Sequence, residues 1–206
     1  MFITIEGPEG SGKTTAVNYA VEQLEKMGYQ IVRTREPGGT PIAEQIRNVI
    51  LDKNNVAMDK RTEALLYAAS RRQHLVEKVW PALKEGKIVI CDRYLDSSLA
   101  YQGGARELGV DNVLAVNSFA TEGTFPDLTL LFDIDPQIGL ARISANSERE
   151  VNRLDLEKIE FHNKVRNTFL ELAKRYKDRF VVIDASKSRE EVAKKTLEVI
   201  LSRICK

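Results

Sequence analysis

The sequence predicts an α/β protein built on a doubly wound, five-stranded parallel sheet with helices on both faces. Short aliphatic runs alternate with longer stretches of helical spacing along the chain. The runs are apolar at consecutive positions, as in strands that are buried on both faces. The connections between them are long enough to be crossovers. Since no repeat, low-complexity tract or linker interrupts this alternation, we expect residues 1–206 to form a single domain.

Five segments have the length and aliphatic character of buried strands. They are Met1–Glu6, Gln30–Arg35, Lys87–Asp92, Leu128–Asp133 and Phe180–Asp184. Several of them end in a polar cluster. Because ligands of open α/β sheets bind beyond the carboxyl ends of the strands, we expect the functional residues to gather at that edge.

Seven further segments carry apolar residues at helical spacing. They are Lys13–Met27, Pro41–Leu51, Thr62–Glu85, Asp111–Glu122, Pro136–Asn146, Leu154–Tyr176 and Arg189–Ile204. Trp80-Pro81 predicts a kink or break in the long Thr62–Glu85 segment, because proline lacks the N–H and clashes with the preceding turn. The last two segments are expected to cover the sheet.

Composition excludes several classes of protein. Hydrophobic residues make up 43% of the chain, which is typical of a globular protein and not of a disordered one. The 31 Lys and Arg balance 30 Asp and Glu, and a main role in nucleic-acid or membrane-surface binding would require a basic excess. No apolar stretch approaches the roughly 18–20 residues of a membrane span. The amino-terminal residues lack the basic segment of a signal peptide.

Cysteine and histidine give little sign of a special site. The two cysteines, Cys91 and Cys205, fit a reducing compartment better than a disulfide scaffold. His74 and His162 belong to no Cys/His cluster at ligand spacing, so we expect no zinc site. Together with the composition, these features predict a cytoplasmic protein that binds neither nucleic acid nor membrane.

The most specific single motif follows the first predicted strand. Gly7-Pro8-Glu9-Gly10-Ser11-Gly12-Lys13-Thr14 fits G-x-x-x-x-G-K-[ST] and lies between a strand and a helix, which is the context that supports a P-loop. Backbone N–H groups of such a loop face phosphate oxygens, and the helix adds its positive dipole end. We expect Lys13 at the β- and γ-phosphates, the Thr14 hydroxyl at Mg²⁺, and Thr15 next to them in the ATP site.

The class of P-loop protein is narrowed by what the sequence lacks. A GTPase would add Asn-Lys-x-Asp, and Asp-x-x-Gly after a strand, and neither motif occurs. A motor or AAA-type ATPase would end a strand in Asp-Glu, whereas here the corresponding strand ends in Cys91-Asp92-Arg93. These differences favour a phosphotransferase that acts on a small molecule.

Further motifs follow in order along nearly the whole chain. They are Thr34-Arg35-Glu36-Pro37-Gly38-Gly39-Thr40, Arg61-Thr62-Glu63-Ala64, Ala69-Ser70-Arg71-Arg72, Asp92-Arg93-Tyr94 and Asp96-Ser97-Ser98-Leu99-Ala100-Tyr101-Gln102-Gly103. Together with the P-loop they closely resemble the bacterial thymidylate kinase family. The resemblance implies the fold of P-loop nucleoside monophosphate kinases, with a short lid at about residues 144–153. It also implies transfer of the γ-phosphoryl group of ATP to dTMP, giving dTDP and ADP, a step of dTTP biosynthesis.

The resemblance assigns roles around the reacting phosphates. Arg93 matches an arginine between donor and acceptor phosphates, and a planar guanidinium suits such bridging. Asp92 matches an acid near Mg²⁺ and the acceptor phosphate, and Arg47 an arginine that holds the dTMP phosphate. Glu9 matches an acid at the acceptor's 3′-OH or a metal-bound water. Because the attacking phosphate oxygen is already ionised near pH 7, we expect no proton-abstracting base.

The family also suggests how the base is recognised. Arg71 matches an arginine that donates to thymine O4, and Ser98 and Gln102 match side chains near the N3 edge of the pyrimidine. Gln102 can accept from N3–H, because its amide has both donor and acceptor atoms. Tyr67 occupies the position of an aromatic that stacks on the base, where phenylalanine is usual. Tyr101 matches a ring against the sugar 2′ position, where it would disfavour a ribose hydroxyl.

The donor side depends on arginines outside the P-loop. Gly10 stands where some family members carry an arginine, and such loops pair with lids that supply the arginine instead. We therefore expect Arg149, Arg153 or both to close over the ATP phosphates from the segment at residues 144–153. Arg142 matches an arginine that stacks on adenine.

Two alternatives remain open at this point. One is a kinase for another nucleoside or small-molecule monophosphate, which the base-recognition residues argue against. The other is a nucleotide-dependent switch or binding module without catalysis, which the complete P-loop and Arg93 argue against. Related enzymes are homodimers, so we also expect a homodimer. The sequence leaves open the rates, the regulation, the number of metal ions and the tolerance for dUMP.

Overall fold

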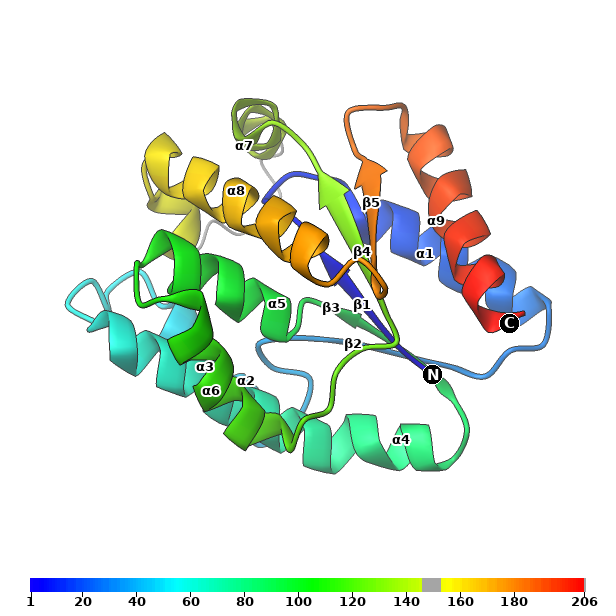
Figure 1. Cartoon of the computed structure of the whole chain (residues 1–206), viewed down its shortest axis with the longest axis horizontal. Coiled ribbons are helices and arrows are strands. Elements are labelled where there is room, and N and C mark those ends of the chain that lie inside the picture. Colours follow the sequence, from blue (N-terminus) through cyan, green and yellow to red (C-terminus); the bar gives the residue numbers. More distant parts are fainter. Residues whose placement is uncertain (146–152, 206) are drawn as a thin grey trace.

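The computed structural model describes residues 1–145 and 153–205. Its centre is a five-stranded sheet in the order β2-β3-β1-β4-β5, in which all neighbouring strands are parallel (Figure 1). The strands are β1 (Phe2–Glu6), β2 (Ile31–Arg35), β3 (Ile88–Asp92), β4 (Leu128–Asp133) and β5 (Phe180–Asp184). The predicted fold class is confirmed, and each predicted strand is present with bounds that differ by at most one residue.

Helices cover both faces of this sheet (Figure 1). The helix α1 (Lys13–Lys26) packs against α9 (Arg189–Ile204) on one face. The other helical elements are α2 (Pro41–Leu51), α3 (Lys60–His74), the π-helical η1 (Leu75–Val79), α4 (Trp80–Lys84), α5 (Leu95–Ser98), the π-helical η2 (Leu99–Ala105), α6 (Val110–Thr121), α7 (Pro136–Ser144), the 3₁₀ segment η3 (Arg153–Leu156) and α8 (Ile159–Arg175). Among the described residues, we find no helix with both the length and the apolar character that crossing a membrane requires.

The hydrophobic core forms two layers, one on each face of the sheet. Successive side chains of a strand point to opposite faces, so Ile3 and Ile5 join the cluster under α1 and α9. Phe2 belongs instead to the cluster under α3, η2 and α8. All five residues of β1 are buried, which explains why this strand has no polar alternation in the sequence.

The long predicted helix over Thr62–Glu85 continues from α3 through η1 into α4. It begins at Lys60, because the Asp59 side chain caps it by accepting from the backbone N–H groups of Arg61 and Thr62. The predicted irregularity at Trp80-Pro81 is present as the π-helical turn before Pro81. A proline ring cannot take part in regular i to i−4 bonding, and a wider turn accommodates it.

The register between β1 and β3 positions the functional edge of the sheet. Ile5 is the register partner of Asp92, and the backbone N–H of Arg93 donates to the Ile5 carbonyl at 2.9 Å. The P-loop, which follows β1, therefore begins beside Asp92 and Arg93 at the end of the neighbouring strand β3. The residues that follow, Leu95–Ala105, are helical, and the sequence pattern did not predict them as a helix.

Candidate active site

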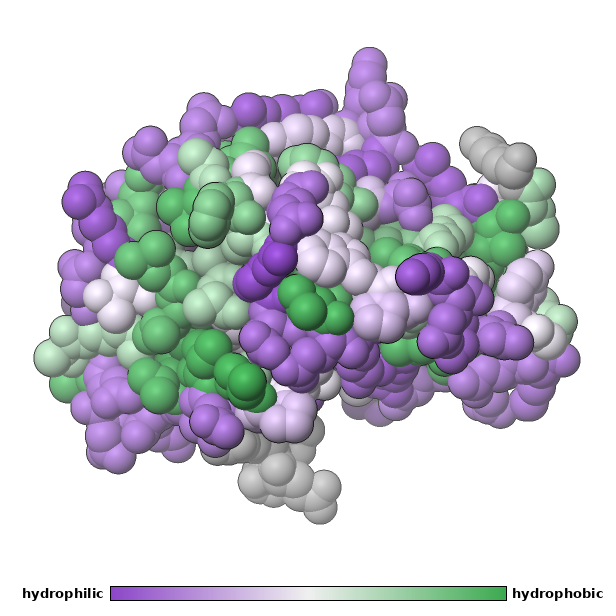
Figure 2. Space-filling model, turned by 90° about the horizontal axis from the view of Figure 1, so that it is seen from below, coloured by the Kyte–Doolittle hydropathy of each residue, from purple (hydrophilic) through white to green (hydrophobic). Residues whose placement is uncertain are grey.

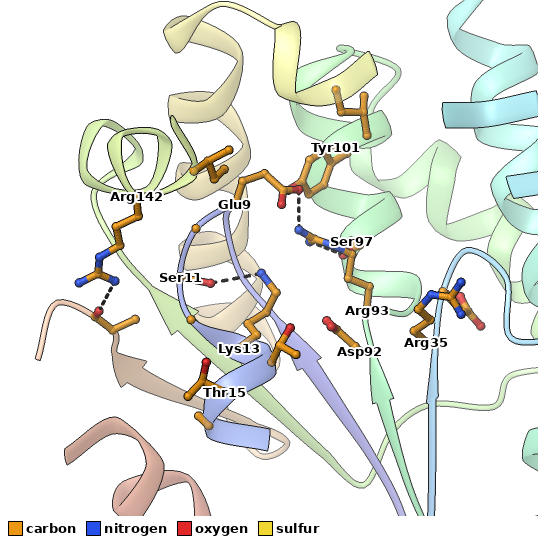
Figure 3. Close-up of a pocket in the computed structure, with 18 of the residues that line it drawn as sticks. Glu9, Ser11, Lys13, Thr15, Arg35, Asp92, Arg93, Ser97, Tyr101 and Arg142 are labelled. Carbon is orange, nitrogen blue, oxygen red and sulfur yellow. Dashed lines mark hydrogen bonds and ion pairs between the residues drawn. The ribbon is translucent and has the colours of Figure 1, made fainter. Parts of the chain in front are cut away.

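A cavity of about 790 Å³ opens at the carboxyl edge of the sheet (Figure 3). Most of the residues singled out from the sequence lie on its wall, although they come from five separate parts of the chain. They are Glu9, Gly10, Ser11, Gly12, Lys13, Thr14, Thr15, Arg47, Tyr67, Asp92, Arg93, Ser98, Tyr101, Gln102 and Arg142. The volume is within the range of nucleotide and cofactor sites.

The P-loop joins β1 to α1 through left-handed glycines. Gly10 and Gly12 have φ angles of 70° and 77°, a region that suits glycine. Lys13 Nζ donates to the Gly7 carbonyl at 3.1 Å and to the Pro8 carbonyl at 2.9 Å, so Gly7 and Pro8 bind the lysine through their backbone. Burial, together with the nearby charge of Arg93, lowers the pKa of Lys13 to about 8. A phosphate next to this ammonium would favour its charged form.

The loop also approaches α7 more closely than side chains permit. A Cβ on Gly10 would lie 2.1 Å from the Gly139 carbonyl oxygen, and one on Gly139 would lie 2.3 Å from the Glu9 carbonyl oxygen. Since both neighbours are backbone atoms, neither position accepts a side chain without a backbone shift. An arginine at position 10 therefore does not fit this arrangement.

Arg93 lies at the centre of the cavity in a cluster with Glu9 and Tyr101 (Figure 3). Its Nη2 is 2.6 Å from Glu9 Oε1, and its Nη1 donates to the Gly7 carbonyl and to Ser97 Oγ. The Tyr101 hydroxyl donates to the same Glu9 oxygen at 3.0 Å, and the guanidinium lies 5.2 Å from the centre of the Tyr101 ring. Burial alone would lower the pKa of Arg93, but the neighbouring carboxylates, Glu9 foremost, raise it, so the charge is permanent.

The backbone of Arg93 is itself unusual, with a φ angle of 68° in the left-handed region. For a non-glycine residue this conformation costs about 1–3 kcal/mol, and such strain clusters at functional sites. The backbone bond to Ile5 and the side-chain bonds to Glu9 hold it in place. The structure thus aims a fixed positive charge into the cavity.

Asp92 precedes Arg93 and has an oxygen without a donor. Its Oδ1 is buried and, within residues 1–145 and 153–205, has no hydrogen-bond partner. The exposed Thr14 adds a hydroxyl to the same cavity. A buried carboxylate oxygen and a hydroxyl are hard oxygen donors of the kind that Mg²⁺ prefers.

The residues that are expected to recognise the base lie partly on the cavity wall and partly behind it. Tyr67, Ser98 and Gln102 line the cavity. Arg71 is 1% exposed and lies behind the wall, where its Nε is 2.7 Å from Glu36 Oε2 and its Nη1 donates to Ser98 Oγ and to Asn117. Its expected contact with the base stays a prediction.

The arginines that are expected to contact the nucleotides lie on different sides of the P-loop. Arg47 lines the cavity beside Pro37 and donates to the Pro37 carbonyl at 2.9 Å. Arg142 lines the opposite side and donates to the Ala185 carbonyl at 3.1 Å (Figure 3). Arg153 pairs with Glu63 at 2.6 Å, and its expected contact with ATP stays a prediction. Arg149 is outside the described residues.

Three buried acids near the cavity received no role from the sequence: Glu6, Glu36 and Glu63. Glu6 is the last residue of a strand whose residues are all buried. Its place at the end of this apolar strand was the sequence signal that could have indicated a buried acid. It accepts from the Tyr94 N–H at 2.8 Å and the Ser97 hydroxyl at 2.5 Å. Burial, and secondarily the nearby Asp96, raise the pKa of Glu6 to about 8.

Glu36 joins His74 and Cys91 in a buried group whose potential ligand atoms lie within 4.8 Å of one another. Its carboxylate already pairs with Arg71, and it lies 2.9 Å from His74 Nδ1. The other ring nitrogen of His74 is 2.7 Å from Thr34 Oγ1. We therefore interpret this group as a hydrogen-bond network that holds Arg71.

A P-loop at the edge of a parallel sheet, with an arginine between two halves of one cavity, defines a phosphotransferase of the P-loop class.

The model of the thymidylate kinase family matches residues 5–196. The thymidylate kinase of Geobacillus sp. (strain WCH70) is 55% identical over 203 residues, which cover 98% of this chain and 97% of the relative. That of Clostridium novyi (strain NT) is 60% identical over 191 residues, 93% of each chain. That of Bacillus velezensis is 59% identical over 200 residues, 97% of this chain and 94% of the relative. The chain belongs to the thymidylate kinase family, which confirms the resemblance drawn from its motifs.

The raised pKa of Glu6 predicts how stability depends on pH. Between its ordinary pKa of 4.5 and about 8, the unfolded chain has lost this proton while the folded chain keeps it. The stability contribution of Glu6 is therefore complete below pH 4.5 and is lost as the pH rises towards 8. The free energy of unfolding in urea is measured at pH 5 and at pH 8. Between these two pH values it should fall less in Glu6→Gln than in the wild type, and the two falls should differ by more than about 1.4 kcal/mol. Exposed Glu22→Gln serves as the control, and parallel profiles for all three proteins would contradict the assignment.

Proposed function

We propose that this enzyme transfers the γ-phosphoryl group of ATP to dTMP, giving dTDP and ADP, and thereby serves dTTP biosynthesis. Membership of the thymidylate kinase family supports this reaction. The observation that supports it best in the structure is a continuous cavity with the P-loop in its middle, Arg142 on one side and Tyr67 with Gln102 on the other. Such a cavity suits two nucleotides that meet at their phosphate ends.

ATP is proposed to bind on the Arg142 side. The P-loop offers inward backbone N–H groups, the positive end of α1 and the Lys13 ammonium for the phosphates. Thr14 and Thr15 are exposed to the same space, and Arg142 has a planar group suited to stacking on adenine. The loop after β5 lines this side too, at Ala185 and Lys187.

The acceptor, dTMP, is proposed to bind on the opposite side. Arg47 would pair with its phosphate, and Tyr67 would stack on the pyrimidine. Ser98 and Gln102 would meet the base edge, with Arg71 behind Ser98. Tyr101 is 3% exposed and held by Glu9, so it cannot yield easily to a 2′-hydroxyl. This rigidity favours a deoxyribonucleotide.

The reaction itself depends on position and charge more than on proton transfer. Arg93, fixed between the two phosphate sites, offsets the charge that develops on the group in transit. Glu9 and Tyr101 orient that guanidinium. The acceptor phosphate is already ionised near pH 7, so the residues around it need only hold it in line.

Mg²⁺ is proposed as the metal cofactor of the site. Thr14 and Asp92 are the residues suited to hold it, since the Thr14 hydroxyl and the Asp92 oxygen that has no hydrogen-bond partner among the described residues are hard donors. When bound, the ion neutralises part of the negative charge on the ATP phosphates. Lys13 and Arg93 supply the remaining positive charge from the chain itself.

A homodimer is proposed as the working assembly. Large apolar side chains are exposed on three adjacent helices: Ile42 and Val49 on α2, Leu65 on α3, and Phe119, which is 90% exposed, on α6. The helix α3 packs against both α2 and α6. Figure 2 shows hydrophobic surface over this side of the molecule. A second copy packed on this face would remove that surface from water.

Two further expectations stay proposals. The two core layers share one sheet, which supports a single domain over residues 1–206. The free thiols of Cys91 and Cys205 fit a reducing environment such as the cytoplasm.

A substrate panel tests the reaction directly. ATP consumption should be highest with dTMP when dTMP, dUMP, UMP, CMP, AMP and GMP are compared, because the acceptor pocket combines a stacking ring with base-edge groups and excludes a 2′-hydroxyl. The measurement is the initial rate with each acceptor under equal ATP. Preference for another monophosphate would support the alternative kinase, and the absence of turnover with every acceptor would support a switch.

The dimer proposal is tested by sedimentation at micromolar concentration. The wild type should have twice the mass of the 23.2 kDa chain. Phe119→Glu should shift it towards the monomer, because a charge in an apolar interface is costly to bury. Met27→Glu, on the exposed end of α1 and 55% exposed in the wild type, serves as the control and should stay dimeric. A monomeric wild type would contradict the proposal.

A further inference from the structure

The third buried acid, Glu63, joins three elements beside the acceptor pocket. It lies in the first turn of α3 and is 1% exposed. Gln102 from η2 donates through Nε2 to Glu63 Oε1 at 2.9 Å. Arg106, just after η2, donates to both carboxylate oxygens at 3.3 Å, and Arg153 from η3 donates to Oε2 at 2.6 Å.

The chemistry of these bonds fixes which end of the Gln102 amide faces Glu63. Burial by itself would raise the pKa of Glu63, but the bond from Gln102 and the charges of Arg106 and Arg153 lower it below its ordinary value. The carboxylate is therefore ionised near neutral pH and can only accept hydrogen bonds. A flipped amide would place its oxygen against a carboxylate oxygen, so Gln102 has to turn its NH₂ group towards Glu63.

The carboxylate is in turn held firmly. Two guanidinium groups bind it from different directions, and Arg106 is anchored further by Glu157 at 2.6 Å. The positive end of the α3 dipole also favours an anion in this first turn. Glu63 thus has little freedom to release Gln102 or to rotate.

The opposite end of the same amide is what Gln102 offers to a ligand. Gln102 lines the cavity, and no donor from the described parts of the chain bonds to its Oε1. Thymine and uracil present a donor at N3, whereas cytosine presents an acceptor there. An amide held with its oxygen available would match the first two bases and would repel cytosine.

We propose that Glu63 is a positioning residue that sets the pyrimidine specificity of the enzyme, by holding the Gln102 amide with its oxygen as the acceptor for N3–H. This inference rests on the proposed function and deepens it. It assigns the choice between keto and amino pyrimidines to a side chain that does not touch the substrate. Arg106 and Arg153 contribute by keeping Glu63 ionised and in place.

The test compares kcat/KM for dTMP, dUMP and dCMP in the wild type and in Glu63→Gln. A neutral amide at position 63 can donate as well as accept, so Gln102 is no longer forced into one orientation. The dTMP to dCMP ratio should fall by at least about tenfold, because discrimination by a buried hydrogen-bonding group is lost. The dTMP to dUMP ratio should stay within about twofold, since both bases carry N3–H.

Glu157→Gln is the matched control. It removes the second carboxylate of Arg106 but leaves the Glu63–Gln102 bond intact, so it should keep the wild-type dTMP to dCMP ratio. A role of Glu63 in stability alone would lower activity towards all three substrates together. Thermal unfolding of each variant checks that the fold is intact.

An active Glu63→Gln with the wild-type dTMP to dCMP ratio would overturn the proposal while leaving the proposed function in place. If this variant does not fold, the double variant Glu63→Gln with Arg106→Met is tested instead. The second substitution removes the Arg106 guanidinium, which has lost the Glu63 carboxylate as its partner. A wild type that uses dCMP as well as dTMP would overturn the inference without any variant. A wild type that uses dCMP but not dTMP would overturn the proposed function as well.

Discussion

The parallel pairing of β1 with β3 is the constraint on which the whole site depends. Its register sets Ile5 beside Asp92, so the P-loop and the Asp92-Arg93 pair leave the sheet next to each other. The bond from the Arg93 N–H to the Ile5 carbonyl extends this pairing by one residue, into a left-handed turn. A slip of one residue would turn every side chain of a strand to the opposite face and would separate the loop from its arginine.

Three buried acids hold groups on the cavity wall and in the layer behind it. Glu6 holds the Tyr94 backbone and Ser97, Glu36 holds Arg71, and Glu63 holds Gln102. Each acid is buried among groups that donate to it, which is the condition under which such side chains persist in a protein interior. Ser97 and Gln102, which line the cavity, are thus oriented before any ligand arrives, and the chain avoids the cost of ordering them at binding.

Much of this arrangement could be predicted from the sequence, because strong local signals coincide with it. The aliphatic runs mark all five strands, and the P-loop motif with its strand and helix marks the phosphate site. The helix over Leu95–Ala105 escaped prediction since its π-helical turns do not follow the 3.6-residue period. Glu63 escaped because a glutamate in a first helical turn is typical of exposed positions. Its burial, like that of Arg71 behind Ser98, depends on distant segments that sequence spacing does not reveal.

Arg93 holds a fixed positive charge between the two parts of the cavity, and we propose that it stabilises the phosphoryl group in transit and does not simply bind a nucleotide. Transient kinetics with Arg93→Lys tests this most directly, because lysine keeps the charge but loses the fork that contacts Glu9, Gly7 and Ser97. The single-turnover rate should fall by about 10²–10³-fold, while the Kd values for ATP and dTMP should change by less than about tenfold. A rate near that of the wild type, or a loss confined to nucleotide affinity, would contradict it.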